Sequence, residues 1–494
     1  MTAETKQLIL GLDIGTSSVR AALYDTQGSV LPQTMVKNER SLTATDDGGA
    51  EIDADEAFDQ VAAAVDDVLK KAEKVKGEIT HVAASCFWHS LVGVDAKGKA
   101  VTKVLAWADT RSREQTAVLR KKFDERSVHN RTGARFHSSF WPAKLSWLKK
   151  AEPKAFARAD KWLSLSDLLA LRLGGEPLTS VSMASGTGIF DIRKYDWDAG
   201  LIKFLKITPA ALPVIAAEDT QTFTLNSKFK KRWPRLADAQ WFPAIGDGAA
   251  NNIGAGCVQK SKAALMIGTS GAMRVAYQGE PPEKIPPGLW CYRIDRRRVI
   301  MGGALSDGGG LYRWLKDNLR LVADDDKTED EIAKRPPTAH GLVFLPFLAG
   351  ERSTGYHENA AGAIIGLRSS TDTIDIVQAA LESVAYRFAE ILDQLSDVCR
   401  IREIIASGGA LRESPVWTQI IADTLARDMT LPNTREASSR GAVLLALETI
   451  GKIESIEKLP TPNGTAFTAD KNNLKIYQAA RYQHEKRYQT VLDD

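Results

Sequence analysis

The stretch that decides the fold runs from Leu8 to Tyr24 and reads LILGLDIGTSSVRAALY. One apolar run precedes the turn D-I-G-T-S-S and another follows it, which predicts a strand, a tight turn and a second strand. The same order recurs from Ala263 to Tyr277, where Gly268-Thr269-Ser270-Gly271 stands between two apolar runs. The chain therefore contains two copies of one hairpin pattern.

The spacing of these copies predicts a duplicated fold. The two Ile-Gly-Thr-Ser quartets start at Ile14 and Ile267, about half of the 494-residue chain apart. Apolar residues recur with helical periodicity over residues 58–72 and 374–395, and strand-like runs at 79–85 and 342–347 lie between these two segments. This alternation predicts an α/β chain with a mixed sheet in each half. We expect two domains, 1–256 and 257–494, with a cleft between them.

The composition excludes several classes of protein. Hydrophobic residues make up 44% and charged residues 26% of the chain, as in ordinary globular proteins. Lys and Arg total 65 against 62 Asp and Glu, so nucleic acid is not expected as the main partner. The four cysteines form no C-x-x-C pair, which argues against a disulfide framework or a zinc knuckle. Without a secretory signal or a membrane-spanning segment, the predicted location is the cytoplasm.

The two glycine turns predict a phosphate site. A glycine followed by two hydroxyl residues exposes several backbone N–H groups and lets an anion approach closely. One such turn is more typical of an ordinary hairpin, but two copies at half-chain spacing favour phosphate binding. The expected contacts are Gly15, Thr16 and Ser17 in the first turn and Gly268, Thr269 and Ser270 in the second. Asp13, at the end of a buried strand, is the candidate ligand of a hydrated Mg²⁺ ion.

A general base and a nucleoside site are predicted from two further glycine segments. Asp247 stands between Gly246 and Gly248 before a helix of small residues. It suits a base that deprotonates an acceptor hydroxyl, although any Asp in this place could also be a helix N-cap. The segment from Ala406 to Leu411 follows a strand and suits a flat ring, or is a simple crossover turn. Candidate nucleotide contacts here and upstream are Gly408, Gly409, Ala410, Gly309 and Gly310.

In this order, the segments around Asp13, Asp247, Gly268 and Gly408 resemble the FGGY family of carbohydrate kinases. The resemblance implies two duplicated ribonuclease-H-like domains of the actin, Hsp70 and hexokinase superfamily, which close over ATP and Mg²⁺. It also implies that Asp247 is the catalytic base, that Asp13 helps to position the metal, and that both glycine turns face the phosphates.

Other segments narrow the resemblance to gluconate and xylulose kinases. These are residues 347–353 and 359–367, while 132–137, 142–145 and 182–190 are closer to gluconate kinases. Two positions depart from the usual family pattern, in which Arg stands in place of Ala361 and Met in place of Trp88.

The predicted substrate contacts lie in the first half. A flat apolar side chain beside a carboxylate and a guanidinium suits a polyol chain. The candidates are Trp88, His89, Trp107, Asp109, Arg111, His137 and Asp247. Alternatively, Trp107 is a core residue, Arg111 pairs with Asp109 on the surface, and His137 is structural. For a substrate carboxylate, Arg111, Arg135 and Lys144 are further candidates, but His89 and His137 are favoured.

The expected function is ATP-dependent phosphorylation of the terminal hydroxyl of a small open-chain sugar or sugar acid, D-gluconate first. The alternatives are a xylulose or other pentulose or polyol kinase, and a non-catalytic nucleotide-binding scaffold. A dinucleotide-dependent oxidoreductase is disfavoured, because Gly11 to Gly15 forms G-x-x-x-G rather than G-x-G-x-x-G. The expected partner is a small molecule, and a homodimer is considered as the assembly.

Overall fold

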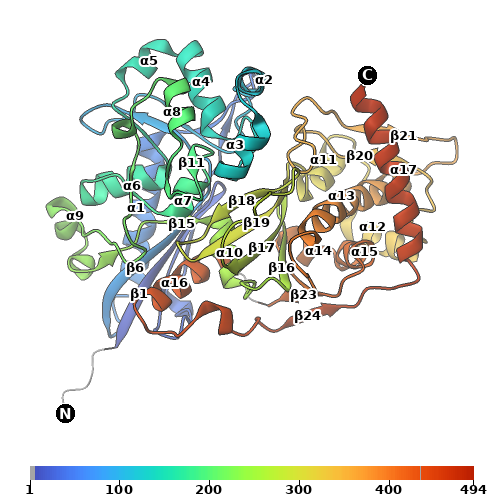
Figure 1. Cartoon of the computed structure of the whole chain (residues 1–494). Helices are drawn as coiled ribbons and strands as arrows, with labels where there is room; N and C mark the ends of the chain where they lie inside the picture. The colour runs from blue at the N-terminus through green and yellow to red at the C-terminus, as the bar shows by residue number, and fades with distance from the viewer. Residues whose placement is uncertain (1–5, 434–435, 494) are drawn as a thin grey trace.

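Two mixed β-sheets, one in each half of the chain, form the frame of the computed structural model (Figure 1). The structure describes residues 6–433 and 436–493. In the first sheet the strand order is β14-β6-β1-β2-β3, with β15 also paired to β6. Its strands are β1 (Gln7–Ile14), β2 (Ser18–Tyr24), β3 (Val36–Glu39), β6 (Glu78–Cys86), β14 (Gln240–Trp241) and β15 (Ile245–Gly246).

The predicted first hairpin is confirmed, because β1 and β2 pair antiparallel. On its other side β1 runs parallel to β6. Asp13, near the end of β1, therefore lies in register with Arg20 of β2 and with Ser85 of β6. Every residue of β1 after Gln7 is buried, so the strand carries Asp13 to the edge of the hydrophobic core.

The second sheet repeats the first. Its order is β18-β19-β17-β16-β22-β23-β24, and the run β19-β17-β16-β22-β23 has the pairing directions of β3-β2-β1-β6-β14. This confirms the duplicated α/β fold. The strands are β16 (Lys262–Ile267), β17 (Gly271–Gln278), β18 (Trp290–Arg293), β19 (Arg298–Leu305), β22 (Glu403–Ser407), β23 (Met429–Pro432) and β24 (Gly464–Phe467).

Two helices cross between the sheets. They are α10 (Asp247–Gly254) and α16 (Ala437–Thr449), and α16 also packs on β1 and β6 of the first sheet. A Cβ atom at Gly254 would lie 1.9 Å from the Ala437 carbonyl oxygen, and one at Gly441 only 1.8 Å from that of Ala250. The two backbones can approach this closely only because both positions are glycine.

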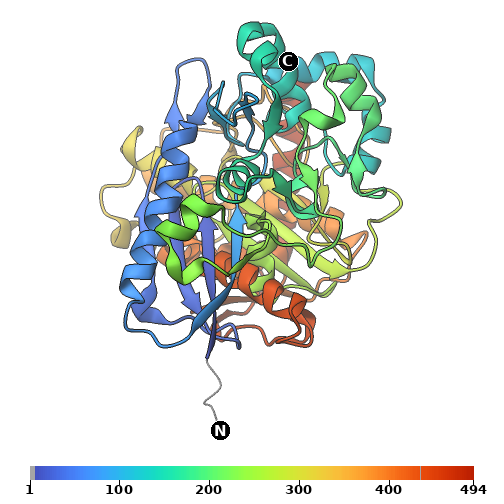
Figure 2. The ribbon, with the colours of Figure 1, turned by 90° about the vertical axis from the view of Figure 1, so that its left-hand side faces the viewer.

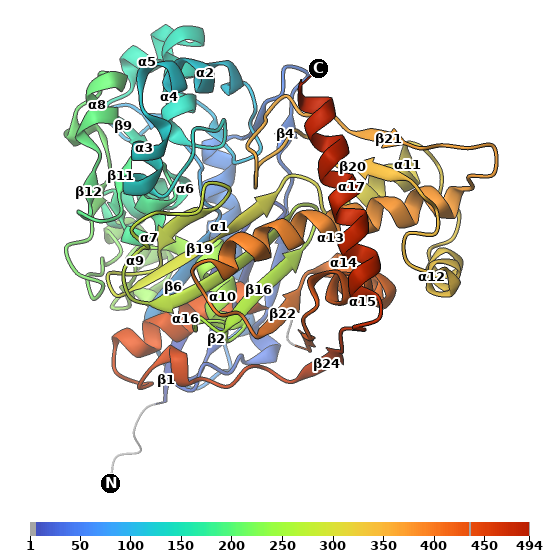
Figure 3. The ribbon, with the colours of Figure 1, turned by 45° about the vertical axis from the view of Figure 1, so that its right-hand side comes forward.

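The outer faces of the sheets are covered by long helices. As predicted, residues 58–72 and 374–395 are largely helical, in α1 (Ala54–Lys71) and α13 (Thr373–Ser396). α1 packs on β2 and β3 (Figure 2), and α13 packs on β17 and β19. The side chain of Asp53 caps α1, and a capping box of Asp372 and Asp375 starts α13. The terminal helix α17 (Leu474–Asp493) crosses α13 and packs on β20 (Val343–Leu345), as Figure 3 shows.

A long insertion between β6 and β15 lies above the first sheet in Figure 1. It contains α2 (Arg113–Lys122), α3 (Glu125–Thr132), α4 (Trp141–Ala151), α6 (Leu165–Gly174) and α7 (Val181–Ser185). This insertion touches the second half directly. The Cys291 amide donates to the Gly133 carbonyl at 2.9 Å, and His129 Nε2 donates to the Leu289 carbonyl at 2.8 Å.

Two runs of charged residues lie at the ends of elements. The acidic run at 324–326 is at the start of α12 (Asp325–Lys334), with Asp324 as the N-cap. Of the three arginines at 296–298, Arg296 and Arg297 lie in the turn between β18 and β19, and only Arg298 lies beyond it. Arg298 begins β19, is buried, and pairs with Asp295 and Glu448 at 2.6 Å each. All four cysteines are free and buried, and within residues 6–433 and 436–493 no helix is long and apolar enough to cross a membrane.

Candidate active site

Asp13 is a buried carboxylate, only 7% exposed, at the carboxyl end of β1. Its Oδ1 accepts a hydrogen bond of 2.7 Å from Ser85 Oγ, and its Oδ2 lies 3.4 Å from Arg20 Nη1. Burial raises the pKa of Asp13, although Ser85 and Arg20 oppose the shift. A carboxylate with one close hydrogen bond and one long ion pair retains capacity for a cation.

Asp247 begins α10 on a floor made by Trp88. A Cβ atom at Gly246 would lie 1.8 Å from the Trp88 ring, and one at Gly248 would lie 2.6 Å from it. Glycine on both sides of Asp247 therefore admits the indole ring directly beneath the loop. Trp88 is buried and its Nε1 donates to the Ser182 carbonyl at 3.0 Å, so the ring has a fixed position.

Arg274, on β17 of the second half, supplies the positive charge beside Asp247. Burial raises the pKa of Asp247, Arg274 opposes the shift, and the charge on Asp13 adds to it. Arg274 is 6% exposed, and its Nη1 has no hydrogen-bond partner among the described residues. Burial lowers the pKa of Arg274 to about 10, which still leaves it charged at neutral pH. The carboxylate and the guanidinium thus meet from opposite halves of the chain.

The donor set fits a magnesium ion better than a metal held by protein alone. Among the described residues there is no group of three or more His, Cys, Asp or Glu side chains that could hold a metal. The charge of Asp13 helps to raise the pKa of Asp247, so the two carboxylates are near enough to interact. Mg²⁺ is commonly bound through one or two carboxylates, with waters and phosphate oxygens as its other ligands.

Three predicted nucleotide segments meet in the second half. The Gly309 amide donates to the Gly268 carbonyl at 2.8 Å, and the Gly310 amide to that of Thr269 at 2.9 Å. Gly408 has a positive φ of 107°, and a Cβ atom there would lie 2.0 Å from the Ile267 carbonyl oxygen. Ala410 is also close, since its Cβ would lie 2.9 Å from one added at Gly309. Gly409 and Thr269 are exposed, and Ser270 is half-buried.

The first glycine turn lies directly after β1. The Gly15 amide donates to the Ser18 carbonyl at 3.0 Å, and Arg40 Nε donates to the Gly15 carbonyl at 2.7 Å. Thr16 is half-buried and Ser17 is exposed. The turn is therefore held by its own backbone and by Arg40, with the hydroxyl of Ser17 facing solvent.

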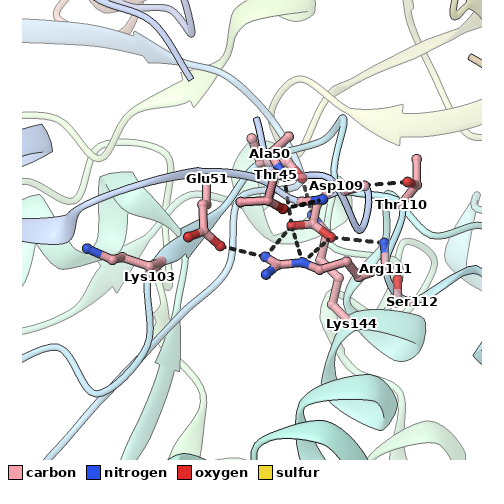
Figure 4. Close-up of polar contacts among 12 residues, drawn as sticks. Thr45, Ala50, Glu51, Lys103, Asp109, Thr110, Arg111, Ser112 and Lys144 are labelled. Carbon is pink, nitrogen blue, oxygen red and sulfur yellow. Dashed lines mark hydrogen bonds and ion pairs between the residues drawn. The ribbon is translucent and has the colours of Figure 1, made fainter. Parts of the chain in front are cut away.

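Arg111 and Asp109 form an internal ion pair with Glu51 (Figure 4). Arg111 Nη2 lies 2.6 Å from both Asp109 Oδ2 and Glu51 Oε2, and its guanidinium stacks 4.6 Å from the Trp147 ring. Asp109 also accepts from the Ala50 amide at 3.1 Å. The alternative of an Asp109–Arg111 pair is thus what the structure contains, but the pair is buried rather than on the surface.

Two histidines of the first half are held neutral by burial. His89 Nδ1 is bonded to the Gly186 carbonyl, which can only accept, so this nitrogen carries the proton and Nε2 is an acceptor. His137 Nδ1 accepts from the Ser139 amide at 3.1 Å, which places its proton on Nε2. Burial lowers the pKa of His89 well below its usual value and that of His137 to about 4. His89 Nε2 therefore suits a substrate hydroxyl better than a carboxylate.

Lys144 is fully buried and does not reach the surface. Its Nζ donates to the carbonyls of His89 at 2.7 Å and Ala106 at 2.8 Å. Burial lowers the pKa of Lys144 to about 7. It therefore ties the loop that carries His89 to the loop that precedes Trp107.

Sequence reasoning missed the side chains that the second half brings against Trp88 and Trp107. Tyr292 stacks on Trp290 at 4.4 Å and meets Trp88 edge-on at 5.2 Å. The guanidinium of Arg352 lies 5.4 Å from the ring of Trp107. Arg352 stands in the segment 347–353 that carries the resemblance, but nothing in its local pattern indicates which residue of the first half it meets.

Comparisons with known proteins agree with this geometry. The family model for the N-terminal domain of the FGGY family of carbohydrate kinases matches residues 8–254, and that for the C-terminal domain matches residues 263–449. The chain is 28% identical to a gluconokinase of Bacillus subtilis (strain 168), covering 95% of this chain and 93% of the relative. It is 26% identical to a xylulose kinase of Staphylococcus xylosus, covering 89% and 90%.

A solved structure agrees as well. The crystal structure of a gluconate kinase from Lactobacillus acidophilus superimposes with a TM-score of 0.90 at 25% identity, covering 99% of this chain and 98% of that chain. The two family models thus include Asp13, Asp247 and both glycine turns, and the relatives cover nearly the whole chain. The chain belongs to the FGGY family of carbohydrate kinases.

Proposed function

We propose that the protein transfers the terminal phosphate of ATP to the C6 hydroxyl of D-gluconate, with Asp247 as the general base. The observation that carries this proposal is the position of Asp247, beside Arg274 from the other half and above Trp88. Gluconokinase relatives, one of them 28% identical, support gluconate as the acceptor.

The proton chemistry follows from the environment of Asp247. Burial raises the pKa of its carboxyl group toward neutral pH, which makes the carboxylate a stronger base than one in water. The guanidinium of Arg274 opposes this shift and so favours the ionised form of the carboxylate. Asp247 then accepts the hydroxyl proton as the oxygen attacks phosphorus, and Arg274 stabilises the negative charge that develops nearby.

The nucleotide and the metal would bind at the other candidate site residues. Backbone N–H groups around Gly268, Gly309 and Gly409 would face the phosphates, so residues 257–494 form the nucleotide domain and residues 1–256 the sugar domain in this proposal. Asp13, with Asp247 beside it, would hold Mg²⁺, which neutralises phosphate charge when bound. Closure of the halves would exclude water from the transferred group.

A neutral pentulose is the second candidate acceptor. The neutral His89, whose Nε2 accepts a hydrogen bond, suits any sugar hydroxyl. A xylulose kinase relative that is 26% identical over 89% of this chain also supports this alternative. Location in the cytoplasm and assembly as a homodimer remain predictions.

The test is a direct comparison of acceptors. We expect kcat/KM, measured by coupled ADP release, to be highest for gluconate among gluconate, xylulose, ribulose, glycerol and erythritol, with 6-phosphogluconate as the product. If a neutral acceptor exceeds gluconate by about tenfold, a difference of roughly 1.4 kcal/mol, the assignment of gluconate fails while a kinase with another substrate remains.

A further inference from the structure

Arg352 carries a charge that no described residue balances at close range. It follows β20 in the second half, and its guanidinium lies over the partly buried ring of Trp107 in the first half. Its side chain makes no hydrogen bond or ion pair with any residue in 6–433 or 436–493. Arg274 shares this feature at its Nη1, whereas three basic residues of the first half do not. Arg111 has Asp109 and Glu51, Arg135 has Glu125 at 3.0 Å, and Lys144 has two carbonyls.

The surroundings of Arg352 have a surplus of positive charge. After burial, the charge on Arg352 is the next cause that lowers the pKa of His89, and it also lowers that of Lys144 and of Arg274. Burial lowers the pKa of Arg352 itself, and Asp247 is the carboxylate that opposes this shift. Asp247 already faces Arg274, so one carboxylate stands against two guanidinium groups.

Tyr292, near Arg352, is a second buried group, and its hydroxyl has no hydrogen-bond partner among the described residues. Its ring lies 5.9 Å from that of His89, and its electrostatic coupling to Arg352 opposes the rise in the pKa of Tyr292 that burial causes. A buried donor without a partner is costly unless a ligand satisfies it. Arg352 and Tyr292 are thus two donors, both brought by the second half, that lack acceptors.

We propose that Arg352, with Tyr292 beside it, binds the carboxylate of a sugar-acid substrate and is the residue that selects acids over neutral sugars. The proposal rests on the proposed gluconate kinase function. A guanidinium matches the two oxygens of a carboxylate, and the pair removes the unbalanced charge. A neutral ketose would leave that charge buried without a counter-ion. Because Arg352 belongs to the second half and Trp107 to the first, an acid would also bridge the two halves.

The experiment compares two acceptors in three variants. Arg352→Gln should lower kcat/KM for gluconate by about 10- to 100-fold, the range expected for a lost charge-assisted hydrogen bond, and change that for xylulose by less than about threefold. Arg352→Lys keeps the charge but loses the planar fork, so its loss on gluconate should be intermediate. Arg368→Gln removes an exposed guanidinium from the same half and should leave both substrates unchanged.

A binding measurement separates the role from catalysis. By calorimetry without nucleotide, Arg352→Gln should weaken gluconate binding by a similar factor and leave binding of its alditol, glucitol, unchanged. Tyr292→Phe should weaken gluconate binding by a smaller factor. Equal losses for gluconate and xylulose in Arg352→Gln would overturn the proposal, because Arg352 would then serve the phosphoryl group or the architecture.

Failure of the proposed function has a different signature. If the wild-type protein prefers xylulose by about tenfold, the gluconate assignment fails and this inference fails with it. If the wild-type protein prefers gluconate and Arg352→Gln keeps that ratio, the inference alone fails. Should Arg352→Gln not fold, the acceptor ratio of Arg352→Lys decides, since an unchanged ratio with full activity contradicts selection by the guanidinium fork.

Discussion

At the scale of single residues, burial and not proximity alone sets the chemistry of the cleft. Asp13 and Asp247 both have a raised pKa because they are removed from water, yet each retains a cationic neighbour, Arg20 or Arg274. The same burial holds His89 and His137 neutral, so these two residues offer uncharged imidazoles while the charges belong to arginines. Desolvation thus separates the groups that bind hydroxyls from those that handle charge.

Asp247→Asn tests the proposed base. We expect turnover to fall by about 10²–10⁴-fold, the usual contribution of general-base catalysis. Nucleotide affinity, measured by calorimetry, should change little, because the side-chain oxygen of Asn can still accept from the Gly248 amide that Asp247 Oδ1 now engages at 2.8 Å. Asp238→Asn, at an exposed site in the same half, is the matched control. Acceptor-dependent turnover within about threefold of wild type would remove Asp247 from this role.

At the scale of elements, the glycine turns and the strands that carry them follow from local sequence. The hairpin of β1 and β2 and that of β16 and β17 have the same order of an apolar run, a glycine-hydroxyl turn and a second apolar run. Hydrophobic periodicity and the residue types of the turn are enough to predict both hairpins. The convergence of Gly309 and Gly408 on the second turn is not local. It depends on the order of β19, β16 and β22 in the sheet, and the hydrophobic periodicity of a single sequence does not indicate that order.

Local sequence also does not indicate which distant segments meet, and this explains which site residues could not be predicted. Asp13 and Asp247 stand next to glycines at strand and helix ends, a signal visible in the chain. Arg274 lies in the middle of a buried strand and Arg352 in a loop, so their roles arise only when the two halves meet. Arg111 was predicted as a sugar contact beside Asp109, but Glu51 from a distant strand completes an ion cluster that local spacing could not indicate.

Gly268→Val tests the second turn. A Cβ atom at Gly268 has no neighbour closer than Met266 Sδ at 3.8 Å, so the fold has room for a side chain. We expect nucleotide binding to weaken by about tenfold or more, because the side chain would block approach of an anion to the backbone, while acceptor binding stays within about twofold. Calorimetry with each ligand separately measures both. Thr269→Val, at the exposed tip, removes only a hydroxyl and should have the smaller effect.

Equal weakening for both ligands in Gly268→Val would indicate general damage to the fold. A melting temperature close to that of the wild type, recorded on the same sample, would exclude that explanation.

At the scale of the whole molecule, the two halves meet in two different ways. Below the cleft, α10 and α16 cross, and glycine at the contact lets the two helix backbones approach each other closely. Above it, the insertion of the first half is bonded to the second half at Gly133, at His129 and through Glu358. The first contact is a packed crossing of two helices, while the second combines hydrogen bonds with a shared hydrophobic core in which Val128 of the insertion lies with Leu289 and Cys291 of the second half. We expect opening of the cleft to separate Glu358 from Thr116 and Ser138.

Glu358 makes two of these upper hydrogen bonds and tests this view. It reaches from the second half and accepts from the Ser138 amide at 2.8 Å and from Thr116 Oγ1 at 2.7 Å, with His137 Nε2 at 3.7 Å. Glu358→Ala leaves these buried donors unpaired in the closed form only. The KM for the acceptor should therefore rise by about tenfold or more, as expected when hydrogen bonds to a charged group are lost, with nucleotide affinity nearly constant.

Matched variants and a solution measurement decide whether Glu358 acts through closure. Glu358→Gln keeps one acceptor oxygen and should lie between wild type and Glu358→Ala, whereas Glu114→Ala, at an exposed site beside the same cavity, should behave as wild type. Small-angle scattering should show that wild type contracts at an acceptor concentration that leaves Glu358→Ala open, and that more acceptor restores the contraction. If Glu358→Ala contracts at the wild-type concentration, or if nucleotide affinity falls as much as acceptor affinity, the upper contacts do not control closure.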